Sequence, residues 1–396
     1  MSDCCSKSTG CCAGSSSPRS LAHFDEMISH CLEYAREAKR AGQPIVGIMC
    51  EYTPRELIMA ADAVPVCLCG GSAEMVPVAE AQLPANLCPL IKSTYGYHLS
   101  GKNPFIEMAD LIVAETTCDG KKKMFELLAE KRPMHVLELP QKAGSEQAMT
   151  LWLEELRQLQ DVLEEKFDVV ITDDKLRKAI QAMNRERRLR RSLAEMMKKD
   201  TPPFTGRQLL KLKSSISAIE ADLEQYERIL DEVENGSVRA DTSGRVRVLM
   251  TGVPVAHGAE RVVDLIEEKG GLIVCMETCT GVKPVLEDVE EDADDPLRAL
   301  ATKYFNLPCS VMTRNDARLD QIRQLVQAYR PDCVIDLVWQ ACLTYDIESD
   351  RVRRMVEDEM GLPYLHIVTD YSPADSARIE VRVEALFEMV QDGARV

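Results

Sequence analysis

Two stretches of sequence decide the fold: DLIVAETTC at residues 110–118 and DCVIDLVWQAC at residues 332–342. Each is a continuous apolar run that ends in a cysteine and leads into a helical pattern. Each is followed by a second apolar run, HVLEL at 135–139 and YLHIVT at 364–369. Continuous apolar runs that alternate with helices are typical of parallel sheets covered on both faces. The two halves of the chain therefore repeat one α/β pattern.

The same pattern continues outward from both stretches. The apolar runs expected to form the remaining strands are residues 44–49, 64–69, 246–250 and 272–276. The segments between strands with helical periodicity are residues 54–63, 121–131, 259–269, 318–328 and 347–360. An amphipathic helix is also expected over residues 21–41, ending at Gly42. The sequence thus predicts two parallel sheets of similar construction.

Composition divides the chain into four parts. Residues 1–20 are rich in Ser, Gly and Cys and are expected to form a disordered tail. Residues 21–150 and 243–396 carry the strands, and each is expected to form an α/β domain. Between them, residues 151–242 have long charged helical stretches and are expected to form a helical connecting region. The basic cluster at residues 185–191 is interpreted as a solvated helix face rather than a site for an acidic partner.

The composition also limits the class of function. The chain has 396 residues with 48 Lys or Arg against 65 Asp or Glu, so its net charge of −17 disfavours nucleic acid and anionic membranes as partners. No run approaches the ~18 apolar residues of a membrane span, and the polar start MSDCCSKSTG lacks a signal-peptide core, so a cytoplasmic location is expected. In that reducing compartment, 15 cysteines indicate metal binding or thiol chemistry rather than disulfides. With only six histidines, an all-thiolate site is favoured.

Six of the cysteines fall in loops, in matching places in the two halves. The carboxyl ends of parallel strands form the crevice where ligands bind, so cysteines distant in sequence are expected to converge there. Converging thiolates suit iron–sulfur ligation, and the small neighbours Thr117, Thr278 and Gly281 leave room for a cluster. The two triplets are Cys50, Cys88 and Cys118 in the first half and Cys279, Cys309 and Cys342 in the second.

The remaining cysteines are interpreted differently. Cys69 is ambiguous, because it closes its predicted strand beside Gly70. Four others lie inside helical or strand runs and are expected to be small core residues: Cys31, Cys67, Cys275 and Cys333. Two pairs in the tail could capture metal, at a cost in chain entropy: Cys4 with Cys5, and Cys11 with Cys12. No phosphate-binding loop is present, so no nucleotide is expected to bind this chain directly.

Three motifs carry a resemblance to a known family: ANLCPLIKSTYG at 85–96, ETTCDGKKK at 115–123 and QAC at 340–342. With them, residues 25–390 or so strongly resemble the 2-hydroxyacyl-CoA dehydratase and benzoyl-CoA reductase family. In the dehydratases of this family each subunit binds one cubane through three cysteines. The corresponding residues here are Cys88, Cys118 and Cys342.

The three further loop cysteines resemble the family's double-cubane branch. The resemblance implies an α/β fold of two similar flavodoxin-like domains with parallel sheets, joined by a long helical region, with the cluster at the domain interface. It also implies an [8Fe-9S] double-cubane cluster, the alternative being a single [4Fe-4S] cluster. By this resemblance Cys50, Cys88 and Cys118 bind one cubane, and Cys279, Cys309 and Cys342 bind the other.

The function implied by the resemblance is that of an oxidoreductase. The chain would be the iron–sulfur component of an ATP-dependent low-potential reductase acting on a small unsaturated substrate under anaerobic conditions. A separate homodimeric ATPase with its own [4Fe-4S] cluster would supply electrons, and the chain itself is expected to be a homodimer. Glu51, Glu56 and His98 are possible proton donors, although each is more often an ordinary surface or capping residue. The alternatives are a single-cubane dehydratase subunit and a non-catalytic electron carrier or scaffold.

Overall fold

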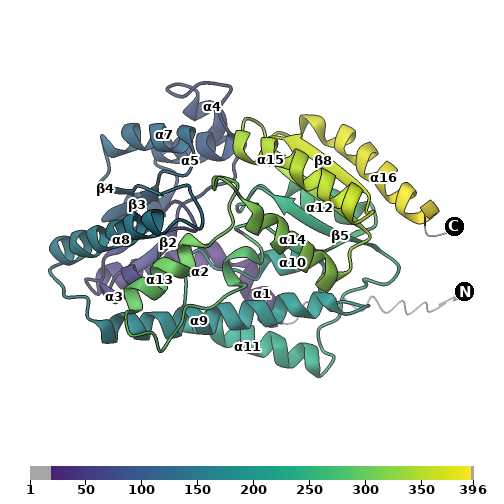
Figure 1. The fold of residues 1–396 in the computed structure, drawn as a ribbon. Coiled ribbons are helices and arrows are strands. Elements are labelled where there is room, and N and C mark those ends of the chain that lie inside the picture. The colour runs from purple at the N-terminus through teal and green to yellow at the C-terminus, as the bar shows by residue number, and fades with distance from the viewer. Residues whose placement is uncertain (1–18, 394–396) are drawn as a thin grey trace, which may run out of the picture.

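The computed structural model describes residues 19–393 and contains two four-stranded parallel sheets (Figure 1). The strand orders are β2-β1-β3-β4 and β6-β5-β7-β8, which is the same order twice and that of a flavodoxin-like sheet. The expected α/β class with two similar parallel-sheet domains is therefore confirmed. The strands are β1 Ile45–Ile48, β2 Val64–Cys67, β3 Leu111–Glu115, β4 Met134–Leu137, β5 Val246–Gly252, β6 Gly271–Glu277, β7 Cys333–Trp339 and β8 Tyr364–Thr369.

Helices occupy most of the chain between the strands. In the first half they are α1 Arg19–Asp25, α2 Met27–Arg40, α3 Arg55–Ala60, α4 Met75–Ala79, α5 Pro89–Ser100, α6 Pro104–Met108 and α7 Asp119–Ala129. The middle of the chain forms α8 Glu146–Phe167, α9 Asp173–Glu195, α10 Gly206–Lys211 and α11 Glu220–Glu234. The second half contains α12 Arg261–Glu268, α13 Pro296–Phe305, α14 Asp316–Tyr329, α15 Leu343–Arg354 and α16 Ser376–Gly393. None of the helices within residues 19–393 combines the length and the apolar character that a membrane span needs.

Two predicted helices have different bounds in the structure. The single helix expected over residues 21–41 is divided into α1 and α2, because Glu26 leaves the helical conformation with φ −99° and ψ 19°. The helix expected over residues 347–360 begins earlier, at Leu343, and ends in a π-helical turn over Met355–Glu359. Both differences lie at helix ends, where hydrophobic periodicity gives little information.

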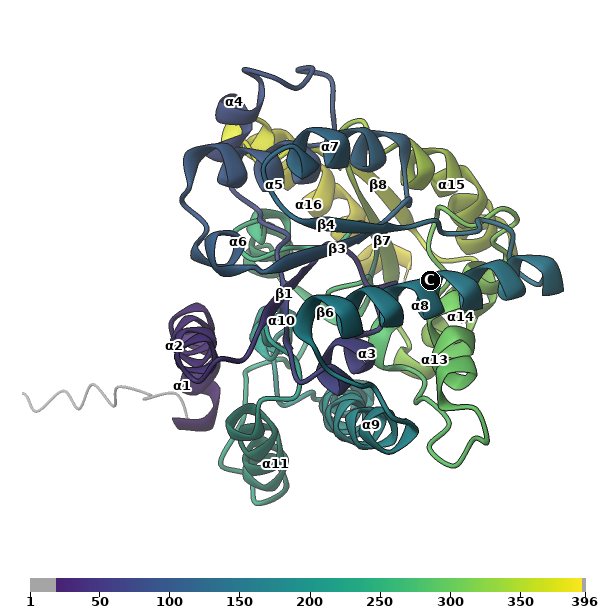
Figure 2. The same ribbon diagram turned by 90° about the vertical axis from the view of Figure 1, so that its left-hand side faces the viewer.

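The central strands β1, β3, β5 and β7 are buried on both faces, whereas the edge strands β4 and β8 are partly exposed. Along β1, Ile45 packs into one core, whereas Val46 and Ile48 pack into the core on the other face. The first of these cores continues from the first sheet to the second, where it includes Met250 of β5 and Ile335 of β7. The view in Figure 2 shows α7 and α8 on opposite sides of the first sheet. One hydrophobic core therefore links the two domains.

The long helix α9 runs below both sheets in the view of Figure 1 and contacts segments that are remote in sequence. Arg187 on this helix is 4% exposed and pairs at 2.5 Å with Glu56 of α3, which is fully buried. The hydroxyl of Tyr304, on α13, donates to the same carboxylate at 2.7 Å. The expectation of a solvated basic face is thus wrong at Arg187. Its neighbours Arg185 and Arg188 form ion pairs with acidic residues of the same chain. Their charges are therefore already neutralised within the protein.

Candidate functional site

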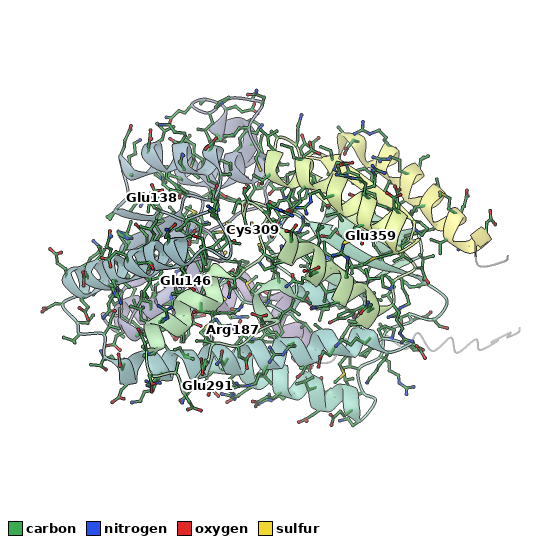
Figure 3. All side chains as sticks on the ribbon, viewed as in Figure 1. Glu138, Glu146, Arg187, Glu291, Cys309 and Glu359 are labelled. Carbon is green, nitrogen blue, oxygen red and sulfur yellow. The ribbon has the colours of Figure 1, made fainter. Side chains whose placement is uncertain are left out.

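The six loop cysteines converge between the two domains. Cys50 follows β1, Cys118 follows β3 and Cys279 follows β6, while Cys342 follows β7. Burial raises the pKa of Cys50 to about 12, and the negative charge of Cys309 adds to this rise. Figure 3 shows Cys309 near the middle of the molecule, between the first and second sheets. The carboxyl ends of the two sheets therefore face one another, as the crevice rule predicts.

Contacts between the loop cysteines cross the domain boundary. Cys88 and Cys342 are hydrogen-bonded to each other, and Cys118 interacts electrostatically with both. In the same way Cys50, Cys279 and Cys309 are mutual neighbours. Cys118 also interacts with Cys309, so the two groups adjoin one another. The division of the six cysteines between two cubanes, one triplet per domain, stays a prediction. The groups are Cys88, Cys118 and Cys342, and Cys50, Cys279 and Cys309.

Three of these cysteines begin helices. Cys88 is the N-cap of α5, Cys118 of α7 and Cys342 of α15. The first N–H groups of a helix carry partial positive charge and stabilise a thiolate or a larger anion. A hydrogen bond from Cys342 lowers the pKa of Cys88 to about 7, and N–H groups at the start of α5 contribute against the opposing effect of burial. The helix starts thus favour an anionic group at this place.

Two lysines, the half-buried Lys121 and the buried Lys283, lie beside the thiols. The ammonium of Lys121 donates to the Met49 carbonyl oxygen at 2.6 Å and interacts with Cys50 and Cys118. Lys283 is 2% exposed, pairs at 2.8 Å with Glu277 and opposes the burial effect at Cys279. Each lysine follows a loop cysteine at short range, in CDGK and CTGVK. This local repetition is a signal in the sequence that the pattern of cysteines alone does not include.

The donor set fits a polynuclear cluster better than a single ion. Within residues 19–393, no three cysteine sulfurs lie within 4.8 Å of one another, as the ligands of one zinc ion would. In an iron–sulfur cluster each thiolate binds a different iron atom, so wider spacing is expected. Six thiols with helix N-termini and lysines beside them therefore match the needs of an anionic iron–sulfur cluster.

A cavity of about 170 Å³ opens beside these cysteines. Cys50 and Cys279 line it, together with Cys67 and Cys69 of the C-x-C sequence that ends the second strand. Cys67 is therefore not the plain core residue that the sequence predicted, whereas Cys31, Cys275 and Cys333 are fully buried as expected. A hydrogen bond from Cys69 lowers the pKa of Cys67 to about 6, and Arg55 contributes.

Positive charge predominates around the cavity. Lys213 and Lys303 line it without a carboxylate partner, and each donates to a carbonyl oxygen, Lys213 to Val255 at 3.1 Å and Lys303 to Pro284 at 3.2 Å. Burial lowers the pKa of each of these two lysines to about 8. Retaining unpaired ammonium groups here opposes folding, which indicates a role in binding.

Of the three possible proton donors, Glu51 alone lines the cavity. Its two carboxylate oxygens accept hydrogen bonds from Arg55, each at 2.9 Å. Glu56 is fully paired with Arg187 and Tyr304, so its role is structural. His98 is buried on α5, where burial and Arg132 lower its pKa, and it does not line the cavity.

Fold and site together define a class: a two-domain α/β protein with thiols gathered where the carboxyl ends of two parallel sheets meet. The chain belongs to the family described as 2-hydroxyglutaryl-CoA dehydratase, D-component, whose model matches residues 50–390. This is a family of enzyme subunits with dehydratase and reductase members, which confirms the resemblance found in the sequence.

Individual relatives agree with this membership. The chain is 41% identical to YjiM of Escherichia coli (strain K12), a protein named as a dehydratase subunit, over 89% of the chain and 93% of YjiM. It is 23% identical to the (R)-phenyllactyl-CoA dehydratase beta subunit of Clostridium sporogenes, over 94% of the chain and 99% of that subunit. It is 22% identical to one of the benzoyl-CoA reductase subunits of Thauera aromatica, over 78% of the chain and 80% of that relative. All three relatives are named as enzyme subunits.

Proposed function

We propose that this chain binds a double-cubane [8Fe-9S] cluster and acts as the reductase component of a two-component system. The observation that carries the proposal is the second group of thiols, which lies beside the first and reaches the cavity through Cys50 and Cys279. A single cubane bound by Cys88, Cys118 and Cys342 leaves this second group without a role. When bound, the cluster would supply electrons at low potential, and a separate homodimeric ATPase with its own [4Fe-4S] cluster would deliver them.

The residues around the cavity support a small anionic substrate. The volume of about 170 Å³ is below the roughly 300–1,000 Å³ of pockets for larger ligands, so an unsaturated acid fits better than a whole coenzyme A thioester. Lys213 and Lys303 would bind the anionic end, because neither has a carboxylate partner. Glu51, positioned by Arg55, is placed to carry a proton at its carboxylate oxygens.

Iron content tests the number of cubanes. We expect anaerobically purified protein to contain about eight iron atoms per chain, whereas a single cubane would give about four. Cys309→Ala is expected to lose about half of the iron and to change the EPR spectrum of the reduced protein. Cys333→Ala is the matched control, because this thiol is fully buried in β7 away from the site, and its iron content should equal that of the parent protein.

The principal alternative is a single-cubane dehydratase subunit, favoured by the names of the relatives and by the hydrogen bond between Cys88 and Cys342. About four irons in the parent, unchanged by Cys309→Ala, would establish this alternative and rule out the double cubane. A non-catalytic electron carrier predicts instead the full iron content but no reduction of acetylene when the ATPase and ATP are supplied.

A further inference from the structure

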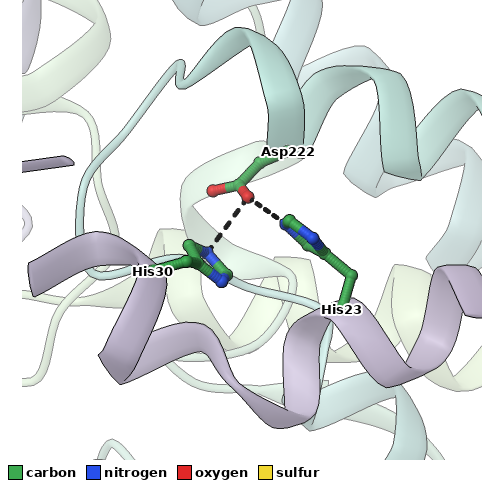
Figure 4. Close-up of side chains that lie close together, drawn as sticks. All are labelled: His23, His30 and Asp222. Atoms are coloured by element: carbon green, nitrogen blue, oxygen red, sulfur yellow. Dashed lines mark hydrogen bonds and ion pairs between the residues drawn. The ribbon is translucent and has the colours of Figure 1, made fainter. Parts of the chain in front are cut away.

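A group of side chains that could hold a metal ion lies apart from the six loop cysteines. It consists of His23 on α1, His30 on α2 and Asp222 on α11, shown in Figure 4. Oδ1 of Asp222 is 2.7 Å from Nε2 of His23 and 3.2 Å from Nε2 of His30. The two imidazole rings are stacked with their centroids 4.4 Å apart. Three potential ligand atoms from three helices therefore point to one place.

Protein contacts leave part of this group unsatisfied. Asp222 is only 3% exposed, and its Oδ2 atom has no hydrogen-bond partner. Nε2 of His30 is buried and lies 3.2 Å from Oδ1 of Asp222, the same oxygen that His23 contacts. These contacts account for Oδ1 and leave Oδ2 of Asp222 without a partner. Buried polar atoms of this kind are uncommon and usually indicate an ion or a water molecule.

We propose that His23, His30 and Asp222 form a binding site for a divalent transition-metal ion, separate from the cysteine site. With metal–ligand bonds of about 2.1 Å, neighbouring ligand atoms lie roughly 3.0–3.4 Å apart, close to the separations seen here. Two imidazoles and one carboxylate suit Zn²⁺ or Fe²⁺.

The position of the site indicates a structural role for the metal ion. His23 and Asp222 are 199 residues apart in sequence, so an ion here ties the first two helices to the connecting region. The neighbouring Phe24 and Tyr226 rings stack at 4.8 Å across the same two helices, α1 and α11. Both histidine side chains are 24% exposed, so the site lies close to the protein surface.

The test uses the full chain with its cluster in place under anaerobic conditions. Cys4, Cys5, Cys11 and Cys12 are all changed to Ser, so that tail thiols cannot bind the probe. This parent is dialysed against Zn²⁺, and zinc and iron are quantified together. We expect one zinc per chain in the parent, and its loss with unchanged iron in His30→Gln and Asp222→Asn. Zinc X-ray absorption should show nitrogen and oxygen ligands only.

The matched control is His257→Gln, a histidine that is 63% exposed beside Glu260 and should leave zinc binding unchanged. Zn²⁺ should also raise the Tm of the parent and of this control but not that of His30→Gln. Equal zinc in the parent and His30→Gln, or sulfur ligands in the absorption spectrum, would overturn the proposal. Asp222→Asn could lose iron because it fails to fold. In that case His23→Gln is measured instead, and a variant that keeps native iron but still binds one zinc would overturn the proposal.

Discussion

At the scale of single residues, buried charges determine much of the behaviour of this protein. Arg187 joins three segments that are remote in sequence, because its guanidinium contacts Glu56 and Tyr304 as well as Asn184 of its own helix. Removing one member of such a group leaves an uncompensated charge in the interior. Exposed ion pairs on the same helix contribute far less, because water screens them.

We therefore expect Arg187→Met to lower the free energy of unfolding by about 3–5 kcal/mol, since Glu56 would stay buried without its partner. Urea denaturation measures this change. Arg188→Met is the control, because Arg188 is 49% exposed, and it should cost less than about 1 kcal/mol. The double variant Glu56→Gln/Arg187→Met should recover part of the loss. A loss as small as that of the control would contradict the structural role given to Arg187.

Replacing Lys303 is expected to raise the free energy of unfolding, in contrast to replacing Arg187. Burial lowers its pKa from 10.5 to about 8, so protonation favours the unfolded state. Lys303→Met should thus stabilise the protein by about 1–3 kcal/mol at pH 7. This gain should be constant below about pH 8 and should vanish as pH rises from about 8 to 10.5. Denaturation series at several pH values would measure it.

The same variant tests the substrate class. If Lys303 binds the anionic end of the substrate, Lys303→Met should raise the KM for propynoate and leave acetylene reduction unchanged. Equal effects on the charged and the neutral substrate would contradict the binding role of this lysine. If the difference in stability between Lys303→Met and the parent were the same at all pH values, the lowered pKa of Lys303 would be contradicted.

At the scale of elements, the helices that begin at cysteines depend on close packing behind them. Gly96 lies in α5, and a Cβ at this position would come within 2.0 Å of the Met75 carbonyl oxygen of α4. The two helices can approach only because this side chain is absent. The position of Cys88, at the start of α5, therefore depends on a glycine two helical turns later.

Gly96→Ala should force α4 and α5 apart and move Cys88 from its place. We expect a loss of about 1–3 kcal/mol in the free energy of unfolding and a lower iron content. Ser100→Ala on the same helix is the control, because it removes an oxygen atom and adds no bulk. A Gly96→Ala protein with native iron would show that Cys88 does not depend on this contact.

The positions of the strands could be predicted well from the sequence. All eight strands lie where continuous apolar runs predicted them, and the strand at residues 364–369 agrees at both ends. Burial on both faces produces such runs, so local sequence suffices to find them. The break at Glu26 and the early start of α15 are not visible in the hydrophobic periodicity of the sequence. The domain boundaries stay a prediction.

At the scale of the whole molecule, the two domains depend on each other for the site. Each group of three thiols draws on both sheets, and one hydrophobic core continues between them. The sequence could indicate which six cysteines lie in loops, but their contacts across the domains depend on the arrangement of the two sheets. For the same reason the cavity position of Cys67 and the meeting of His23 with Asp222 were beyond sequence reasoning.

Removal of the cluster should therefore loosen the contact between domains more than the domains themselves. We expect hydrogen–deuterium exchange in the apo protein to rise in the loops around Cys50, Cys279 and Cys309, with β1 and β5 still protected. The cluster-containing protein, measured under the same anaerobic conditions, is the reference. A uniform rise over both sheets would show instead that the cluster stabilises each domain separately.

The cavity that reaches Cys50 and Cys279 has a further consequence. An opening that admits a small unsaturated acid also admits dioxygen, which is smaller and uncharged. The lysines that line the cavity would favour a negatively charged ligand, but they present no barrier to a neutral gas. The working lifetime of this protein in air would then be set by how quickly oxygen diffuses through its own substrate entrance.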